Sequence, residues 1–416
     1  MRTGKYCCKV NNKGENMHSK TIFNIKTEVK RVILKYKENP LKAYFKILFY
    51  VLAGAFKNHF PKRPPKGNEI YIAFIIEGGL GDFLININFI HCLIEKVYQT
   101  NIHIDIITNS KSFAQSLIPD LPGLHKIKVI EKIKYLKGYY DLEIKIFRRP
   151  YILYKNIERI KNFAPQLLPF LSAWEVKQEQ FSLLYDNAPY LEGTADILDA
   201  ADGKKRFVQA DIANLLNMDY TFKAAIKTDK EKETLQKFNL FRRTYITIAR
   251  EVGYDKVVES TKLWPLDNYR ELTKLIKQNF PNVTIAEVGA GKGTRIAENI
   301  DVVLSGKTSL EEAKAIIKNS LLHIDTEGGL SYLRHALHGG ASIILMGPTD
   351  PNIYNLEGNI CICSKACPIH CAELLPQWQE NCHKIKDKNI CMKSITVDMV
   401  FSEVKKILNE AGCRTN

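Results

Sequence analysis

The chain has 416 residues, enough for two or three domains, and its content of 45% hydrophobic and 25% charged residues supports an ordinary globular core. Its formal net charge of +15 first suggests binding to nucleic acid or to anionic lipid. Residues 1–66, however, hold 16 Lys and Arg against three acids, a net of +13, so the rest of the chain carries only +2. This distribution excludes a nucleic-acid-binding surface spread over the globular body.

The basic N-terminal arm, residues 1–66, contains two apolar stripes at helical spacing, 22–36 and 41–56. Its uncharged part, 47–56, is too short to span a bilayer. It also lies too far from the start of the chain for a signal peptide, so we expect a cytoplasmic protein. Two basic amphipathic helices fit a peripheral anchor on an anionic membrane. The alternative is that they pack on the body as ordinary helices.

A glycine-rich turn follows the first predicted strand. Residues 70–76 are apolar without a break, which is typical of a strand buried on both faces of a parallel sheet. The turn contains Gly78, Gly79 and Gly81, which permit a tight bend and close approach of a ligand, and Asp82 opens a helical pattern. A strand, such a turn and a helix start together make a site for an anion or cofactor. The tetrapeptide Glu-Gly-Gly-Leu of this turn recurs at 327–330 in a similar context. We therefore expect two α/β domains that present similar turns to a shared cleft.

Strand and helix patterns alternate in both halves of the chain. In the predicted first domain, 67–235, strands are expected at 70–76, 103–108, 126–130 and 141–146. In the second, 236–395, strands are expected at 245–249, 283–288, 302–304, 321–324 and 342–346, and segment 396–416 adds a helix at 397–410. This alternation predicts an α/β protein with two Rossmann-like, doubly wound parallel sheets.

Five short motifs occur in a fixed order. They are Gly-x-Gly-Asp at 79–82, Lys-x-Trp-Pro at 262–265, Gly-Lys-Thr-Ser-Leu at 306–310, Glu-Gly-Gly-Leu at 327–330 and Gly-Pro-Thr-x-Pro at 347–351. In this order they resemble glycosyltransferase family nine, the lipopolysaccharide heptosyltransferase family, over roughly residues 70–410. The resemblance implies a GT-B fold with the sugar donor mainly on the C-terminal domain. It also implies an inverting transfer, usually from ADP-heptose, without a catalytic metal.

An inverting transfer needs a base for the acceptor hydroxyl, and positive charge or N–H donors for the departing diphosphate. Asp82 resembles the family's base, although its place at a helix start also fits a simple cap. Lys262 resembles the lysine that binds the donor phosphate; the alternative is a surface lysine. The turn at 325–329 resembles the nucleotide-sugar loop. The donor-binding candidates are Lys262, Thr326, Glu327, Gly328 and Gly329, with Arg250 as a further phosphate ligand.

The sequence departs from the family at two points, which bear on the identity of the donor more than on the fold. Tyr332 stands where the family loop usually has a His, and the loop 251–261 is longer than expected.

Six of the ten cysteines lie between 361 and 391. Four of them, Cys367, Cys371, Cys382 and Cys391, could supply thiolates to a structural zinc or iron, although their spacing is not a standard Cys-x2-Cys knuckle. Some protein-modifying members of the family that the chain resembles carry a metal on cysteines in this region. Free structural thiols are the other interpretation, because disulfides do not suit a reducing cytoplasm.

Together these features predict an inverting glycosyltransferase that moves a sugar, heptose from ADP-heptose as the family implies, to a lipopolysaccharide-type glycan. No cofactor is expected for catalysis. The expected partners are a nucleotide-diphosphate sugar, a glycan or lipid-linked glycan acceptor and the anionic cytoplasmic face of the inner membrane, but no nucleic acid. A protein O-heptosyltransferase and a non-catalytic nucleotide-binding scaffold remain alternatives. A dinucleotide-dependent enzyme is disfavoured, because Leu84 occupies the third glycine position of Gly-x-Gly-x-x-Gly.

Overall fold

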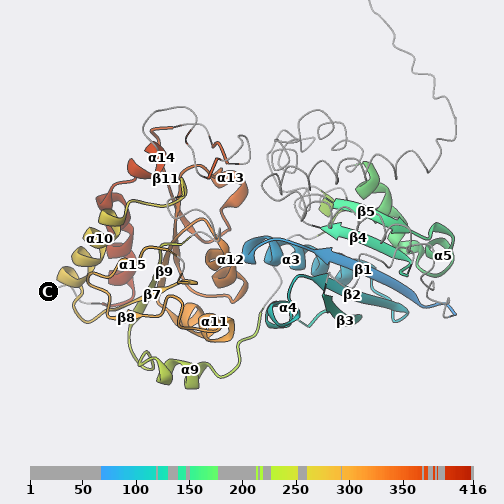
Figure 1. Ribbon diagram of the computed structural model, residues 1–416, viewed down its shortest axis with the longest axis horizontal. Coiled ribbons are helices and arrows are strands. Elements are labelled where there is room, and N and C mark those ends of the chain that lie inside the picture. The colour runs from blue at the N-terminus through green and yellow to red at the C-terminus, as the bar shows by residue number, and fades with distance from the viewer. Residues whose placement is uncertain are drawn as a thin grey trace, which may run out of the picture. The chain divides into compact units, whose positions relative to one another are not determined.

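The computed structural model contains two β-sheets, each with its own helices (Figure 1). It describes residues 67–413, apart from 119, 130–138, 147–149, 177–211, 214–215, 219–225, 252–259, 292, 368–369, 373–377, 380–381 and 383–388. The amphipathic arm predicted for residues 1–66 lies outside the described residues and stays a prediction. Among the helices that are described, none has the length and apolar character needed to cross a bilayer.

The first sheet has five strands in the order β3-β2-β1-β4-β5. They are β1 (Ile70–Ile76), β2 (Ile102–Thr108), β3 (Leu124–Val129), β4 (Leu142–Ile146) and β5 (Pro150–Lys155). The first four run parallel, whereas β5 pairs antiparallel with β4. The central strand β1 is buried along its whole length, because both faces of the sheet are covered.

Helix α3 (Leu80–Val97) begins directly after the turn that ends β1. The other helical elements of this half are α4 (Lys111–Leu117), α5 (Ile157–Phe163) and η3 (Pro165–Leu167). Phe89 of α3 packs against Phe170 and Trp174, with its ring centre 5.5 Å from that of the fully buried Trp174. This aromatic contact and the apolar face of α3 fix the helix on the sheet, and with it the glycine-rich turn at its start.

The second sheet has six parallel strands in the order β11-β10-β9-β6-β7-β8. They are β6 (Tyr245–Ala249), β7 (Thr284–Val288), β8 (Val302–Val303), β9 (Leu322–Thr326), β10 (Ser342–Met346) and β11 (Ile360–Cys363). Its helices are α9 (Glu231–Lys237), α10 (Leu266–Asn279), α11 (Leu310–Asn319), α12 (Gly329–Ala336), α13 (Pro351–Tyr354), α14 (Ile390–Lys393) and α15 (Val397–Glu410).

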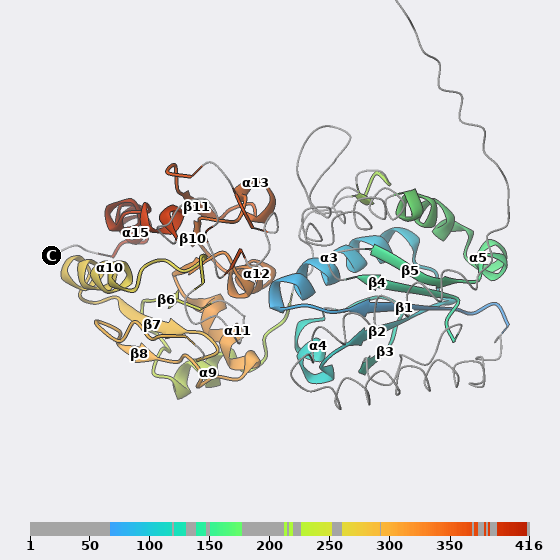
Figure 2. The ribbon, with the colours of Figure 1, turned by 45° about the horizontal axis from the view of Figure 1, so that its top comes forward.

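Side chains of β6 alternate between the two faces of the second sheet, as the pleat of a strand requires. Ile246 and Ile248 belong to the core that α10 and α15 cover, whereas Tyr245 and Ala249 belong to the core that includes α11 and α12. Figures 1 and 2 show α10 and α15 on one side of this sheet and α9 and α11 on the other. Helices on both faces make the sheet doubly wound, so the predicted α/β class is confirmed.

The two strands that the sequence did not predict lie at the outer edges of the sheets. β5 is an antiparallel edge strand, and β11 is a short edge strand of sequence Ile-Cys-Ile-Cys within the cysteine-rich segment. Edge strands have one paired side and are less buried, so they lack the continuous apolar run that marks the central strands.

Candidate functional site

Asp82 caps the helix that begins at the first glycine-rich turn. It is the third residue of α3, and its Oδ2 accepts a hydrogen bond from the backbone N–H of Gly79 at 3.0 Å. Gly78 has φ +117°, a conformation that favours glycine. The carboxylate is half-buried, and the helix N-terminus stabilises its negative charge. The capping contact is therefore present, and it uses one carboxylate oxygen; the role of Asp82 as a base stays a prediction.

The second glycine-rich turn lies at the start of α12 and contacts the first. A Cβ added to Gly329 would come within 2.7 Å of Leu80 Cβ, and one added to Gly81 within 3.1 Å of the Tyr332 ring. This close approach explains glycine at both positions. The N-cap of α12 is Gly328, so no side chain caps the first N–H groups of this helix. Uncapped N–H groups at a helix start are available to an anionic ligand.

Lys262 and Glu327, two predicted donor ligands from distant parts of the sequence, form an ion pair. Nζ of Lys262 contacts Oε2 of Glu327, and the two side chains are only 15% and 7% exposed. The ammonium group also lies 5.8 Å from the ring centre of Trp378. In this partly buried setting each charge stabilises the other in the absence of a ligand. Lys262 is therefore not a solvated surface lysine.

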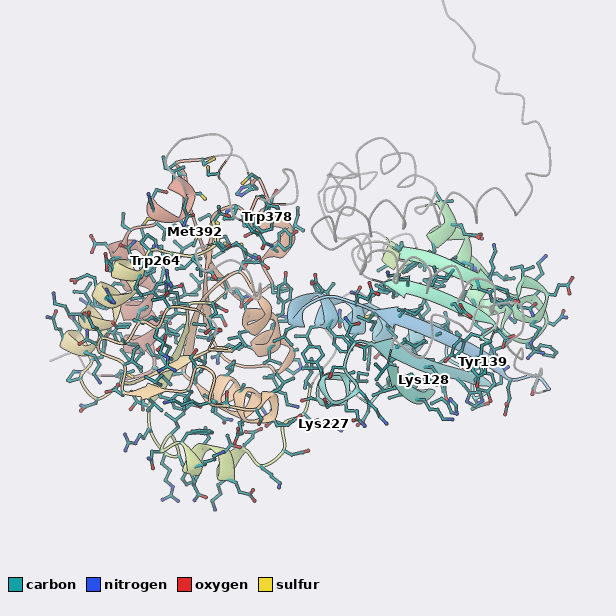
Figure 3. The ribbon with its side chains drawn as sticks, viewed as in Figure 1. Lys128, Tyr139, Lys227, Trp264, Trp378 and Met392 are labelled. Atoms are coloured by element: carbon teal, nitrogen blue, oxygen red, sulfur yellow. The ribbon has the colours of Figure 1, made fainter. Side chains whose placement is uncertain are left out.

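Anchored neighbours hold Lys262 in place. The fully buried Trp264 donates from Nε1 to the carbonyl oxygen of Ile395 at 2.8 Å. On the other side, Oγ1 of Thr261 donates to the carbonyl oxygen of Trp378 at 2.7 Å. Figure 3 marks both tryptophans in the C-terminal half. Pro265 is then the N-cap of α10, so the backbone at Lys262 lies between the anchored Thr261 and the buried Trp264 that precedes the helix.

Burial shifts the pKa values of two groups on β9. Burial lowers the pKa of His323 to about 3, and the guanidinium of Arg334 acts in the same direction. Burial, followed by the nearby carboxylate of Glu327, raises the pKa of Asp325 well above its usual value. His323 Nε2 lies 3.6 Å from Asp325 Oδ2, and its Nδ1 lies 2.9 Å from Thr247 Oγ1. Because the histidine is neutral at neutral pH, its close contact with the Asp325 carboxyl group is not a salt bridge.

Buried polar atoms with no hydrogen-bond partner among the described residues gather near the carboxyl ends of the strands of the second sheet. They are Oε2 of Glu287 on β7, Oδ1 of Asp325 and Oγ1 of Thr326 on β9, and Oγ1 of Thr349 after β10. Buried polar atoms are normally hydrogen-bonded. This edge is also where ligands bind in doubly wound sheets. It is therefore the part of the described chain best suited to accept hydrogen bonds from, or donate them to, a bound molecule.

Arg250 directly follows β6, between the strands that carry these atoms. It is 3% exposed, and its Nη1 donates to the carbonyl oxygen of Thr294 at 3.3 Å. The structure thus places the predicted phosphate ligand at the expected edge of the sheet, where the loop after β7 covers it.

Sequence reasoning missed several residues of this edge. His323 and Glu287 are buried polar residues within predicted strands, and an isolated polar residue in an apolar run gives no local signal. Glu251, which follows Arg250, accepts hydrogen bonds from the glycine-rich loop 289–293. The glycine-rich loop itself is the signal that could have identified Glu251. It follows a predicted strand, and the sequence motifs assign no ligand to it.

The six cysteines between 361 and 391 divide into a pair and a group of four. Cys361 and Cys363 on β11 have their Sγ atoms 3.0 Å apart. The others are the predicted metal ligands Cys367, Cys371, Cys382 and Cys391. Burial, and then the nearby thiols of the other three members of this group, raises the pKa of Cys391 to about 11. All six are free thiols, and within the described part of the chain no three Cys, His, Asp or Glu side chains are arranged to hold a metal ion.

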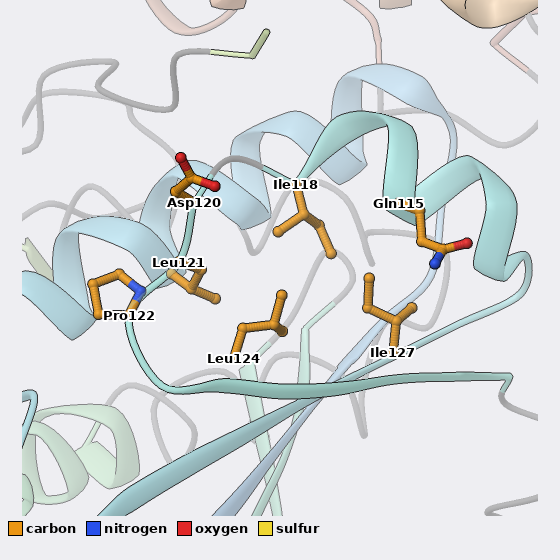
Figure 4. A pocket seen from close by; sticks show the side chains of 7 residues that line it. All are labelled: Gln115, Ile118, Asp120, Leu121, Pro122, Leu124 and Ile127. Atoms are coloured by element: carbon orange, nitrogen blue, oxygen red, sulfur yellow. The ribbon is translucent and has the colours of Figure 1, made fainter. Parts of the chain in front are cut away.

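A cavity of ≈ 550 Å³ lies in the first half, between α4 and the edge strand β3 (Figure 4). Its lining is mainly apolar and includes Ile118, Leu121, Leu124 and Ile127. None of the predicted site residues lines it, so it is separate from the polar edge of the second sheet.

Residues 204–373 match the sequence model of glycosyltransferase family 9, described as heptosyltransferase. This segment contains Lys262 and Glu327. It also contains the buried polar atoms near the strand ends of the second sheet that have no hydrogen-bond partner among the described residues. The resemblance to glycosyltransferase family 9 that the motifs indicated is thereby confirmed. No match was found among curated proteins.

Solved structures agree on the fold. The ADP-heptose lipopolysaccharide heptosyltransferase II of E. coli superimposes with a TM-score of 0.52 at 14% identity, over 82% of this chain and 100% of that one. The iron-containing dodecameric glycosyltransferase TibC of enterotoxigenic E. coli H10407 gives 0.54 at 13% identity, over 84% and 78%. TibC in complex with ADP-D-β-D-heptose gives 0.53 at 12% identity, over the same shares. The chain therefore has the GT-B fold, and residues 204–373 match a glycosyltransferase family.

Proposed function

We propose that this protein is an inverting glycosyltransferase that transfers heptose from ADP-heptose to a lipopolysaccharide-type glycan. The observation that carries the proposal is the partly buried Lys262–Glu327 pair, formed between the start of α10 and the turn before α12. A cation, a carboxylate and an uncapped helix start at one edge of the sheet suit a ligand with both anionic and hydroxyl groups. A nucleotide-diphosphate sugar has both.

In this proposal the residues of the second sheet bind the donor. Lys262 and the N–H groups of Gly328 and Gly329 stabilise the negative charge that develops on the departing diphosphate, with Arg250 adding positive charge behind them. Glu327 and Thr326 bind hydroxyl groups of the sugar or the ribose. Because these groups are fixed in place before the ligand arrives, little reorganisation is needed when the glycosidic bond to phosphate breaks.

The acceptor side of the proposed reaction rests on Asp82. An acceptor hydroxyl attacks the anomeric carbon from the face opposite the leaving diphosphate, and Asp82 Oδ takes its proton. The N–H groups at the start of α3 interact favourably with the negative charge of this carboxylate. The transfer relies on correct placement of the acceptor, to which Gly78, Gly79 and Gly81 allow close approach, and on the good leaving group.

A protein hydroxyl is the second candidate acceptor, and the cysteine group favours it. The thiols of Cys367, Cys371, Cys382 and Cys391 influence one another, as the raised pKa of Cys391 indicates. They would hold zinc or iron as a structural metal that stabilises the loops after β11, with no part in the chemistry. TibC, an iron-containing glycosyltransferase, has the same fold.

Membrane association is the remaining part of the proposal, and it rests on the net charge of +13 in residues 1–66. A basic amphipathic arm would hold the enzyme at the cytoplasmic face of the inner membrane, close to a lipid-linked acceptor. Flotation with anionic vesicles, comparing the full chain with one that starts at Pro65, tests this. Equal, salt-insensitive flotation of both would contradict it.

The test of the donor is a thermal-unfolding screen with ADP-heptose, ADP, and UDP, GDP and CMP sugars. A ligand at a hundred times its dissociation constant stabilises the folded state by about 2.7 kcal/mol, so the shifts rank the candidates. ADP-heptose is expected to give the largest rise in melting temperature. A larger rise with another nucleotide sugar would replace the donor, and no rise with any of them would favour the scaffold. The product from a matching acceptor, analysed for anomeric configuration, then tests inversion.

A further inference from the structure

The carboxylate of Glu251 is surrounded by hydrogen-bond donors from one glycine-rich loop. Its Oε2 accepts from the backbone N–H of Ala290 at 2.6 Å. Its Oε1 accepts from the N–H of Gly291 at 2.8 Å, the N–H of Gly293 at 3.4 Å and the hydroxyl of Ser305 at 2.9 Å. No Lys or Arg among the described residues forms a salt bridge with it, so these bonds alone satisfy its charge within that part of the chain.

The loop is shaped around this carboxylate. A Cβ added to Gly289 would lie 2.8 Å from Cδ of Glu251, and one added to Gly293 would lie 3.1 Å from its Cγ. Gly289 and Gly291 also have φ of +151° and +80°, in the region that favours glycine. The glycines therefore both turn the N–H groups inward and leave the space that the side chain of Glu251 fills.

The donors come from the ends of adjacent strands. Glu251 lies two residues after β6, the loop 289–293 directly follows β7, and Ser305 lies two residues after β8. These three strands are neighbours in the order β6-β7-β8. One carboxylate therefore ties together the carboxyl ends of half the sheet, on the edge that also holds Lys262 and Glu327.

Successive backbone N–H groups that converge in a glycine-rich loop after a parallel strand form a nest, which is a known way to bind phosphate and other oxyanions. The sequence Gly-Ala-Gly-Lys-Gly at 289–293 has the composition of such a nest. In this chain the oxyanion is supplied by the protein itself.

We propose that loop 289–293 and Ser305 form an oxyanion-binding site that Glu251 occupies as an internal ligand, and that this carboxylate is the positioning residue of the loop. A small carboxylate or phosphate should enter the site only when Glu251 is removed. Because the site is filled in the intact protein, the diphosphate of a donor is left to Lys262 and the start of α12. This last consequence rests on the proposed function, whereas the oxyanion site does not.

The test is anion rescue of Glu251→Ala, without any nucleotide. Thermal unfolding is followed in sodium formate and in sodium phosphate, each against sodium chloride at equal ionic strength. Glu271→Ala is the matched control, because Glu271 lies on α10, is about half exposed and pairs with Lys274 at 3.3 Å. Glu251→Ala should melt lower than the wild type and regain roughly 2–4 °C in formate or phosphate. The wild type and Glu271→Ala should show no such gain.

An equal effect of formate on all three proteins would overturn the proposal, because the nest would then not be the binding site. Should Glu251→Ala fail to fold, Glu251→Gln decides the question. Its amide retains one acceptor but turns N–H groups toward the loop donors, so amide hydrogen exchange at 290–293 should accelerate at least several-fold, and unchanged exchange would also refute the proposal. If no nucleotide sugar bound in the thermal-unfolding screen, the anion-rescue result for Glu251→Ala would still stand. The proposed oxyanion site and the proposed donor site can therefore be refuted independently.

Discussion

Substituting Lys262 by alanine tests the donor site most directly, because the structure predicts two separate effects. The first is on stability. The substitution leaves the carboxylate of Glu327, whose side chain is 7% exposed, without its cation. Removing one partner of a fully buried pair costs 3–5 kcal/mol. Here the lysine is 15% exposed and water enters the space that it leaves, so we expect the free energy of unfolding to fall by about 2 kcal/mol.

The second effect is on ligand binding. A charge-assisted hydrogen bond contributes about 1.5–3 kcal/mol, so Lys262→Ala should weaken binding of ADP and ADP-heptose roughly 10- to 150-fold. Adenosine, which lacks the diphosphate, should bind as before. Isothermal calorimetry with the three ligands measures this difference.

A double variant separates the two effects. In Lys262→Ala with Glu327→Gln the buried charge is gone, so stability should return to within about 1 kcal/mol of the wild type, while diphosphate binding should stay weak. Unchanged affinity of Lys262→Ala for ADP would remove Lys262 from the phosphate site. Full recovery of ADP binding in the double variant would show that the loss came from the unpaired carboxylate instead.

Three further predictions concern the other groups. Asp82→Asn should lower turnover about 10²–10⁴-fold with nearly unchanged melting, because asparagine can still accept from the Gly79 N–H; near-full activity would leave Asp82 as a cap only. Protein purified without chelator should contain about one zinc or iron per chain and lose stability when the metal is removed; metal-free protein with the same melting point refutes the Cys367–Cys391 site. His323 has a pKa of about 3 in the folded protein against 6.5 in the unfolded chain. The stability that depends on its neutral form is therefore fully present above pH 6.5 and is lost as the pH falls toward 3, because only the unfolded chain binds the proton in this range. At pH 5 this loss is about 2 kcal/mol. The free energy of unfolding of His323→Gln should not show this loss between pH 8 and pH 5.

The fold was predictable because the central strands carry their own signal. The run at 70–76 is apolar throughout and those at 245–249 and 342–346 are mainly apolar, and the observed strands β1, β6 and β10 have those bounds. The strand β11 has a cysteine at every second position and lies at a sheet edge, so its sequence indicates thiol chemistry rather than a strand. The sequence pattern thus predicts the buried central strands and the edge strands β3 and β8, but not the edge strands β5 and β11.

The site was predictable only where a motif marked it. Lys262 and Glu327 were found through short motifs, but nothing in either motif shows that they pair, because the contact joins α10 to the turn before α12. The importance of Asp325 and Glu251 depends wholly on non-local surroundings. Asp325 matters because it is buried beside Glu327, and Glu251 because a loop some forty residues later wraps around it. Local sequence cannot give burial or partners of this kind.

The charges at this edge are balanced before any ligand arrives. Lys262 is paired with Glu327, Glu251 is held by loop N–H groups, and burial raises the pKa of Asp325 and keeps His323 neutral. A diphosphate that recruits Lys262 therefore frees the carboxylate of Glu327, which is too buried for water to solvate fully and needs a new donor.

A hydroxyl of the transferred sugar or of the ribose can be that donor, and the two possibilities give different results. If Glu327 accepts from the transferred sugar, ADP leaves it unsatisfied and ADP-heptose does not, so the intact donor should bind more tightly than ADP. Glu327→Gln should then reduce that difference by about tenfold, the effect of one hydrogen bond to a charged group. Calorimetry of both ligands against both proteins measures it. If the substitution changes the two affinities by the same factor, Glu327 contacts the nucleotide, and another group at this edge, such as Asp325, must recognise the sugar.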